Sequence, residues 1–139
     1  MSTWTPPPHW TETGSQLRKT GSVVLDGNGN GVLNFDPDHA NQRWVITQVV
    51  VSTDQSATST VIPVATLALN AVTMGTLSPG NQRGATWSGI QDTFTGNMDV
   101  GPCDFMAVIF GPPAGTSGTA LSGVTATAIC TGTKYTRRA

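Results

Sequence analysis

The stretch WVITQVVVST, residues 44–53, is the strongest strand signal in the chain and decides the expected fold. Val, Ile, Thr and Trp make up most of it, and these are the residue types enriched in β-strands. It contains no Gly or Pro that would end a strand. The stretch therefore predicts a long β-strand.

The same character recurs on both sides of this stretch, in short runs separated by Gly and Pro. Residues 62–69 and 121–130 alternate between two faces, whereas FMAVIF, residues 105–110, is a continuous apolar run typical of a strand near the core. Asn70-Ala71 predicts a turn. Residues 23–25 and 32–35 predict a hairpin across a Gly/Asn stretch, and residues 86–88 predict a further short strand.

No segment shows a helical stripe with caps, and no period repeats along the chain. Seven or eight short strands in about 115 residues predict one all-β domain, an antiparallel β-sandwich or jelly roll. Charged residues make up 11% of the chain, far below the usual quarter, and Thr, Gly, Ala, Val and Ser dominate instead. Because disordered chains carry more charge and fewer aliphatic residues, we expect a folded domain.

The charges are divided unevenly along the chain. Residues 1–20 and 134–139 together carry a net +4, residues 21–133 carry −5, and the whole chain carries −1. This total gives no reason to expect a nucleic-acid partner. The basic ends either contact an acidic surface or a neighbouring copy, or they are solvated tails. Both interpretations stay open.

The chain is expected to consist of an extended arm (1–20), a β-sandwich (21–133) and a basic tail (134–139). Three consecutive prolines favour an extended conformation in the arm, and two tryptophans bracket them. Large aromatic side chains on an arm predict docking to a neighbour, the alternative being that the arm folds back on its own domain. The predicted interface residues are Trp4, Pro6, Pro7, Pro8, Trp10, Leu17, Arg18 and Lys19 in the arm, and Tyr135, Arg137 and Arg138 in the tail.

The segment LDGNGNGVLNF, residues 25–35, begins like a calcium-binding loop, with Asp26 followed by alternating Asn and Gly. A helix–loop–helix calcium site needs a carboxylate at the twelfth position, but that position is Pro37, and Asp36 and Asp38 are out of register. Gly and Asn tolerate the positive φ of tight turns. We interpret the segment as a turn. A non-helical calcium site that uses Asp26 with Asp36 or Asp38 is the alternative.

No catalytic, metal or cofactor site is predicted. His9 and His39 lie in the arm and in a loop, with no nucleophile at a recognisable spacing, and two His with two Cys do not form a zinc pattern. Cys103 and Cys130 are expected to be buried free thiols rather than a disulfide. The chain is therefore expected to be non-enzymatic and to use no cofactor.

The first residues, MSTWTPPPHW, lack the basic start and apolar run of a secretory signal. No stretch approaches the ~20 apolar residues that span a bilayer. We therefore expect synthesis in a cytoplasm and no membrane partner.

Four stretches carry a resemblance to a known group. These are GSVVLDGNGNGVLNFDP (21–37), QRWVITQVVVST (42–53), PVATLALN (63–70) and SGIQDTFTG (88–96). The chain resembles small β-rich virion proteins of tailed phages that infect actinobacteria, in which similar motifs follow in this order. The resemblance covers residues 21–125, carries no catalytic residue over, and leaves the arm and tail outside it.

The resemblance implies a particle component, located in the virion and made in the host bacterial cytoplasm. We expect a capsid decoration or cementing protein that contacts the major capsid protein and sister subunits, with a trimer as the expected oligomer. A minor tail or baseplate component is the close alternative. A second class is a host-glycan-binding module with Trp87 as the candidate ligand contact, because Trp44 is expected in or beside the core.

Overall fold

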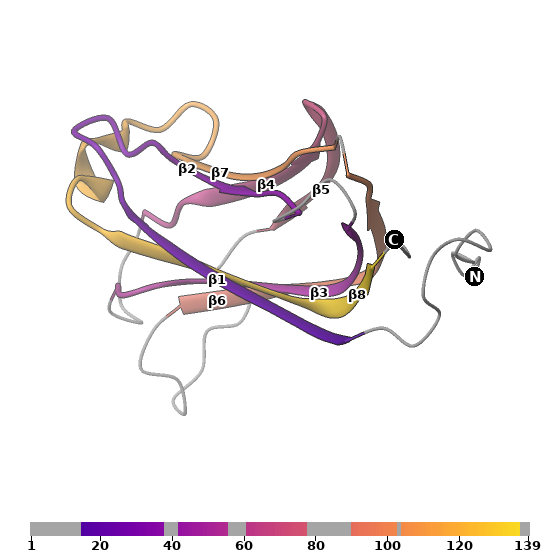
Figure 1. The fold of residues 1–139 in the computed structure, drawn as a ribbon. Coiled ribbons are helices and arrows are strands. Elements are labelled where there is room, and N and C mark those ends of the chain that lie inside the picture. The colour runs from indigo at the N-terminus through magenta and orange to yellow at the C-terminus, as the bar shows by residue number, and fades with distance from the viewer. Residues whose placement is uncertain (1–14, 38–41, 56–60, 78–89, 103, 137–139) are drawn as a thin grey trace.

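Two four-stranded antiparallel sheets face each other in the computed structural model of the chain (Figure 1). The structure describes residues 15–37, 42–55, 61–77, 90–102 and 104–136. The first sheet has the strand order β1-β8-β3-β6 and the second the order β2-β7-β4-β5. The strands are β1 (Ser15–Val24), β2 (Gly31–Phe35), β3 (Gln42–Thr53), β4 (Val64–Leu69), β5 (Val72–Leu77), β6 (Ile90–Val100), β7 (Met106–Gly111) and β8 (Thr125–Thr136).

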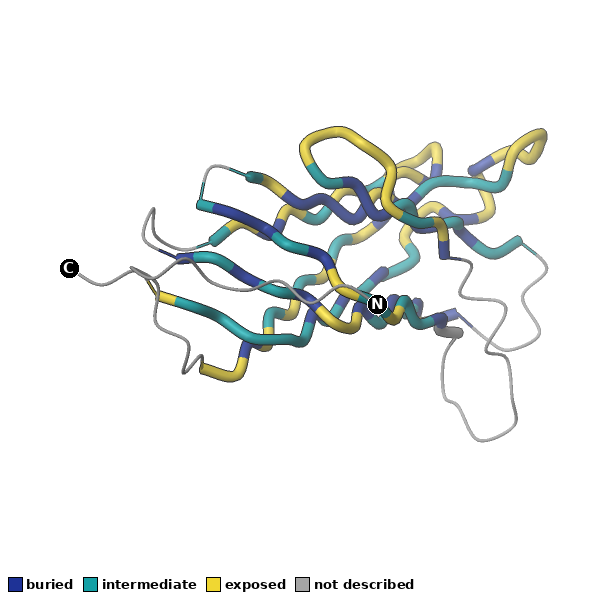
Figure 2. Tube along the Cα trace, turned by 90° about the vertical axis from the view of Figure 1, so that its right-hand side faces the viewer, coloured by how far each residue is buried: buried dark blue, intermediate teal, exposed yellow. Residues whose placement is uncertain are grey.

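The expected antiparallel β-sandwich is therefore confirmed. Buried and exposed residues alternate along the strands (Figure 2), because successive side chains of a strand point to opposite faces. The core lies between the two sheets. Its largest fully buried side chains are Trp44, Phe110, Leu17, Leu25, Ile46, Leu67, Met98, Met106 and Leu121.

The stretch that predicted the fold is β3, a central strand of the first sheet. A β-bulge lies between Ile46 and Gln48, where the pairing with both β6 and β8 shifts. The bulge adds one residue to the strand. The buried side chains therefore change from even-numbered positions before it, Trp44 and Ile46, to odd-numbered positions after it, Val49 and Val51. A side chain at Gly132 on β8 would overlap the main chain of this bulge. Glycine at 132 is therefore required by the close approach of the two strands.

The prediction of a hairpin between residues 23–25 and 32–35 is wrong. β1 pairs with β8 in the first sheet, and β2 pairs with β7 in the second. Residues 25–30 therefore form a corner that carries the chain from one sheet to the other. A short Gly/Asn loop between two apolar runs is compatible with both connections, so the local sequence could not separate them.

Two strands were not expected. β5 and β6 carry mostly Thr, Gly, Asn and Asp between isolated apolar residues, so neither shows an apolar alternation long enough to predict it. The expected turn at Asn70-Ala71 joins β4 to β5, and both residues have positive φ, 51° and 66°. Residues 86–88, predicted as a short strand, lie outside the described residues.

The strands also reach into the segments expected as arm and tail. β1 begins at Ser15 and β8 ends at Thr136, and Ser15 pairs with Lys134 across the sheet. Residues 15–20 and 134–136 are thus strand residues of the sandwich.

Candidate interaction surfaces

Many of the predicted interface residues lie outside the described residues, and so do the candidate ligand contact Trp87, the loop residue His39 and Cys103. Those interface residues are Trp4, Pro6, Pro7, Pro8, Trp10, Arg137 and Arg138.

The remaining four predicted interface residues lie on β1 and β8, and one of them is misplaced. Leu17 is 2% exposed and belongs to the core, because it points inward on β1 opposite Gly132. Arg18, its neighbour, is exposed on the outward face. Tyr135 is half-buried and pairs with Arg43 of β3. A core position for Leu17 excludes it as a contact to a neighbouring molecule.

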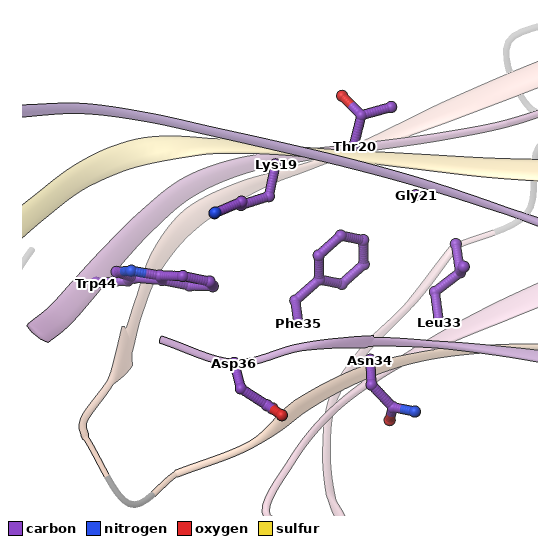
Figure 3. A pocket seen from close by; sticks show the side chains of 8 residues that line it. All are labelled: Lys19, Thr20, Gly21, Leu33, Asn34, Phe35, Asp36 and Trp44. Atoms are coloured by element: carbon purple, nitrogen blue, oxygen red, sulfur yellow. The ribbon is translucent and has the colours of Figure 1, made fainter. Parts of the chain in front are cut away.

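Lys19 occupies an inward position on β1, an edge strand, and its Nζ lies 5.6 Å from the centre of the Trp44 ring. A cation above an aromatic face is attracted by the quadrupole of the ring. Lys19 and Trp44 line a pocket of about 240 Å³ between the edges of β1 and β2, together with Phe35 and Asp36 (Figure 3). The long Lys19 side chain reaches along this opening toward Trp44.

The pocket does not offer a platform on which a sugar ring could stack. Trp44 is 1% exposed and Phe35 is also buried, so neither ring presents an exposed face to a ligand. The expectation that Trp44 packs in the core is confirmed. Its indole Nε1 is a buried donor without a hydrogen-bond partner among the described residues, and Figure 3 shows that nitrogen on the side away from Phe35.

An ion pair links β3 and β6 near the same end of the sandwich. Arg43 Nη1 donates to Asp99 Oδ2 at 2.8 Å, and the two residues lie near each other across the ladder. Burial raises the pKa of Asp99, while the Arg43 charge acts in the opposite direction. The other oxygen of Asp99 is buried without a hydrogen-bond partner in the described part of the chain, and the ion pair is a contact between two neighbouring strands.

The segment that begins at Asp26 is a turn, as expected. Asp26 Oδ1 accepts hydrogen bonds from the backbone N–H groups of Asn28 at 2.8 Å and Asn30 at 3.0 Å. These hydrogen bonds lower the pKa of Asp26, because they stabilise the charged form. The carboxylate thus organises its own loop. In the described ranges, no three His, Cys, Asp or Glu side chains gather where they could hold a metal ion.

The two sheets differ sharply in charge, which sequence analysis missed. The strands of the first sheet contain six charged residues: Arg18, Lys19, Arg43, Asp92, Asp99 and Lys134. The strands of the second sheet contain none. The sequence does contain four charge-free segments, but only the strand order shows that these four segments form one sheet.

The outward side of the second sheet, here the uncharged face, consists of two cross-strand rows. One row runs Val32–Ile109–Thr66–Thr76 and the other Asn34–Ala107–Ala68–Thr73. Val32 and Ile109, paired in the first row, are 49% and 41% exposed. On the edge strand β5, Val72 and Met74 are 62% and 45% exposed. In the two outward rows, the exposed large apolar side chains are Val32 and Ile109, whereas Ala68 and Ala107 are buried; Val72 lies in the row of the buried Met106.

No family model and no curated protein matches the chain. Among the described residues, no helix has the length and apolar character needed to cross a membrane.

Among solved structures, the chain is similar to dimeric latent PorU from Porphyromonas gingivalis at 6% identity and a TM-score of 0.39, over 96% of this chain and 14% of that one. It is similar to the catalytic domain of a GH87 α-1,3-glucanase at 11% identity and a TM-score of 0.37, over 96% and 27%. A third similarity is to the VP2 subviral particle of infectious bursal disease virus, at 11% identity and a TM-score of 0.33, over 92% and 42%. The chain spans less than half of each of these proteins, and likenesses at this level carry no argument about its function.

Proposed function

We propose that the protein is a non-enzymatic structural component of a phage virion, a capsid decoration or cementing protein that binds the assembled head shell. The observation that carries the proposal is the uncharged face, which exposes Val32 and Ile109 on a sheet without a charged residue. The strands of this sheet contain no charged side chain. Contact with another protein would therefore not remove water from a charge on these strands.

The resemblance to small virion proteins of actinobacterial phages supports the same proposal. Its motifs at 42–53 and 63–70 coincide with β3 and β4, which are central strands of the two sheets. The resemblance therefore rests on residues that build the sandwich.

In this proposal, the terminal segments reinforce the contact made by the sandwich. β1 and β8 are neighbours in the first sheet, and Ser15 pairs with Lys134. Ser15 and Thr136, the described residues at the two ends, therefore lie at the same end of that sheet, and we propose that both terminal segments contact the same neighbour. The major capsid protein and sister subunits are the proposed partners, and the virion is the proposed location.

The test mixes purified protein with undecorated shells of its phage and measures co-sedimentation. We expect the full chain to bind expanded shells and Ile109→Lys to bind at least tenfold more weakly, because a buried charge would lie in the interface. Ala114→Lys, in an exposed loop, is the matched control and should bind like the full chain. Removal of residues 1–14 measures the contribution of the arm.

Failure of the full chain to bind any form of the shell would overturn the decoration proposal. Binding to isolated tails or baseplates would then favour the minor tail alternative, which shares every feature described above. The glycan-binding alternative rests on Trp87, and a glycan array with Trp87→Ala tests it directly.

A further inference from the structure

The corner between the two sheets contains both Asn-Gly pairs of the chain, Asn28-Gly29 and Asn30-Gly31. Asn is a thermolabile residue, and a following glycine has no side chain to hinder attack by its own backbone nitrogen. In this reaction the glycine nitrogen bonds to Cγ of the Asn and the Cγ–Nδ2 bond breaks. The amide leaves as ammonia and takes the proton of the backbone N–H. Water then opens the cyclic imide to Asp or to isoaspartate, whose main chain runs through Cγ and is one carbon longer.

The side chain of Asn28 is accessible, but the backbone nitrogen that would attack it is not free to do so. Asn28 is exposed, and among the described residues no hydrogen bond holds its side-chain amide. Gly29 N, the attacking group, donates a hydrogen bond to the Asp26 carbonyl at 2.9 Å. Asn28 N donates to Asp26 Oδ1 at 2.8 Å, which fixes the same turn from the other side. Attack on the Asn28 side chain therefore requires this turn to open.

The peptide that joins Asn28 to Gly29 is also packed against η2 (Gly118–Leu121), a short 3₁₀ turn. A Cβ added at Gly118 would overlap the Asn28 carbonyl oxygen and lie 2.6 Å from the carbonyl carbon. Gly29 itself is buried. Because the interior of a protein is close-packed, this peptide cannot rotate toward the Asn28 side chain until the corner separates from η2.

We propose that Asn28 is a modification site, a deamidation site that opens only when the corner separates from η2, and that the folded corner excludes the isoaspartate product. The additional main-chain carbon would have to fit where Gly118 leaves no room even for a Cβ. The Asp product keeps the original main chain and carries its charge on an exposed side chain, so it remains compatible with the fold. This inference does not depend on the virion role.

The first test incubates the full chain in mildly alkaline buffer, with and without urea, and follows position 28 by peptide mapping. We expect Asn28 to be lost at least about tenfold more slowly in buffer, because the reaction follows the population of chains with an open corner. Asn30→Ser, used in both samples, leaves one Asn-Gly pair and makes the map unambiguous. Equal or faster loss of Asn28 in buffer would overturn the inference.

Two glycine substitutions test the role of η2. Gly118→Ala should accelerate the loss of Asn28 in buffer, because its Cβ forces the corner away from η2. Gly27→Ala is the matched control in the same loop, since a Cβ at Gly27 meets nothing within 4 Å, and it should leave the rate unchanged. Equal rates in the two folded variants would contradict the proposal. The comparison of buffer with urea needs neither variant and decides the question even where Gly118→Ala does not fold.

The second test asks which product returns to the fold. Chains aged in urea are refolded by dilution, and the folded fraction is separated by size exclusion and mapped. We expect Asn and Asp at position 28 in the folded fraction, and isoaspartate only outside it. Asn28→Asp supplies the Asp product alone and should fold like the parent chain. Isoaspartate at position 28 in the folded fraction, at the proportion present before refolding, would overturn its exclusion from the corner.

Discussion

At the scale of single residues, close backbone approach explains one glycine, Gly29, of the segment that first suggested a metal loop. Gly29 has φ +80°, and a Cβ there would lie 2.7 Å from the carbonyl oxygen of Gly118 and 3.0 Å from Leu121 Cβ. The corner at residues 25–30 thus packs directly on the short 3₁₀ turn η2 (Gly118–Leu121). Gly29 is therefore needed for packing between these two loops.

Gly29→Ala should destabilise the fold by about 2–4 kcal/mol, because it adds left-handed strain to an overlap with backbone. Gly27→Ala is the matched control in the same loop, since a Cβ at Gly27 meets nothing within 4 Å. It should change the free energy of unfolding by less than about 0.5 kcal/mol. Urea denaturation monitored by tryptophan fluorescence measures both values. Equal effects of the two substitutions would contradict the packing at Gly29.

Cys130 should be unreactive in the folded protein. It is fully buried and free in the inner face of β8, and burial raises its pKa to about 12. Since the thiolate is the reactive form, a thiol reagent should label Cys130 only after unfolding. The measurement uses Cys103→Ser, so that one thiol remains, and compares labelling in buffer with labelling in denaturant. Rapid labelling in buffer would contradict the burial.

At the scale of the element, the β4–β5 hairpin shows local strain that one substitution should relieve. Ala71 has φ 66°, a conformation that costs an L residue about 1–2 kcal/mol, whereas glycine adopts it freely. Glycine also makes the unfolded chain more flexible, which offsets part of this gain. Ala71→Gly should therefore raise the free energy of unfolding by about 0.5–1 kcal/mol.

The control for this hairpin is Ala114→Gly, at another exposed alanine whose φ is not positive. That substitution should give no gain in the midpoint of thermal unfolding. A loss of stability in Ala71→Gly would show that the turn differs from the described geometry.

The elements also show which parts of the fold were predictable. β3 could be predicted because it is rich in β-branched residues, β7 because it is apolar along almost its whole length, and the Asn70-Ala71 turn because of its residue types. β5 and β6 could not, since their pairing depends on partners distant in sequence rather than on their own composition. The uncharged face emerges only from the strand order. The expected arm contacts at Trp4 and Trp10 stay a prediction.

At the scale of the whole molecule, the strand order predicts how truncation acts. A chain that begins at Ser15 should retain the sandwich, because β1 is complete and Leu17 fills its core position. A chain that begins at Leu25 should fail to fold, because it loses that edge strand and its core side chains. Heteronuclear NMR spectra of the two chains measure this difference. Dispersed spectra from both would contradict an essential role for β1.

The position of β8 has a further consequence for synthesis on the ribosome. β8 follows the other seven described strands in the sequence, yet it lies between β1 and β3 and joins them into one sheet. The nascent chain therefore holds β1 and β3 without their common partner until β8 has been synthesised. During that interval the charge-free strands β2, β4, β5 and β7 have already emerged with their apolar residues uncovered. The first sheet can consequently close only after β8 has been made, so we expect the yield of folded domain to depend on how quickly β8 inserts between β1 and β3.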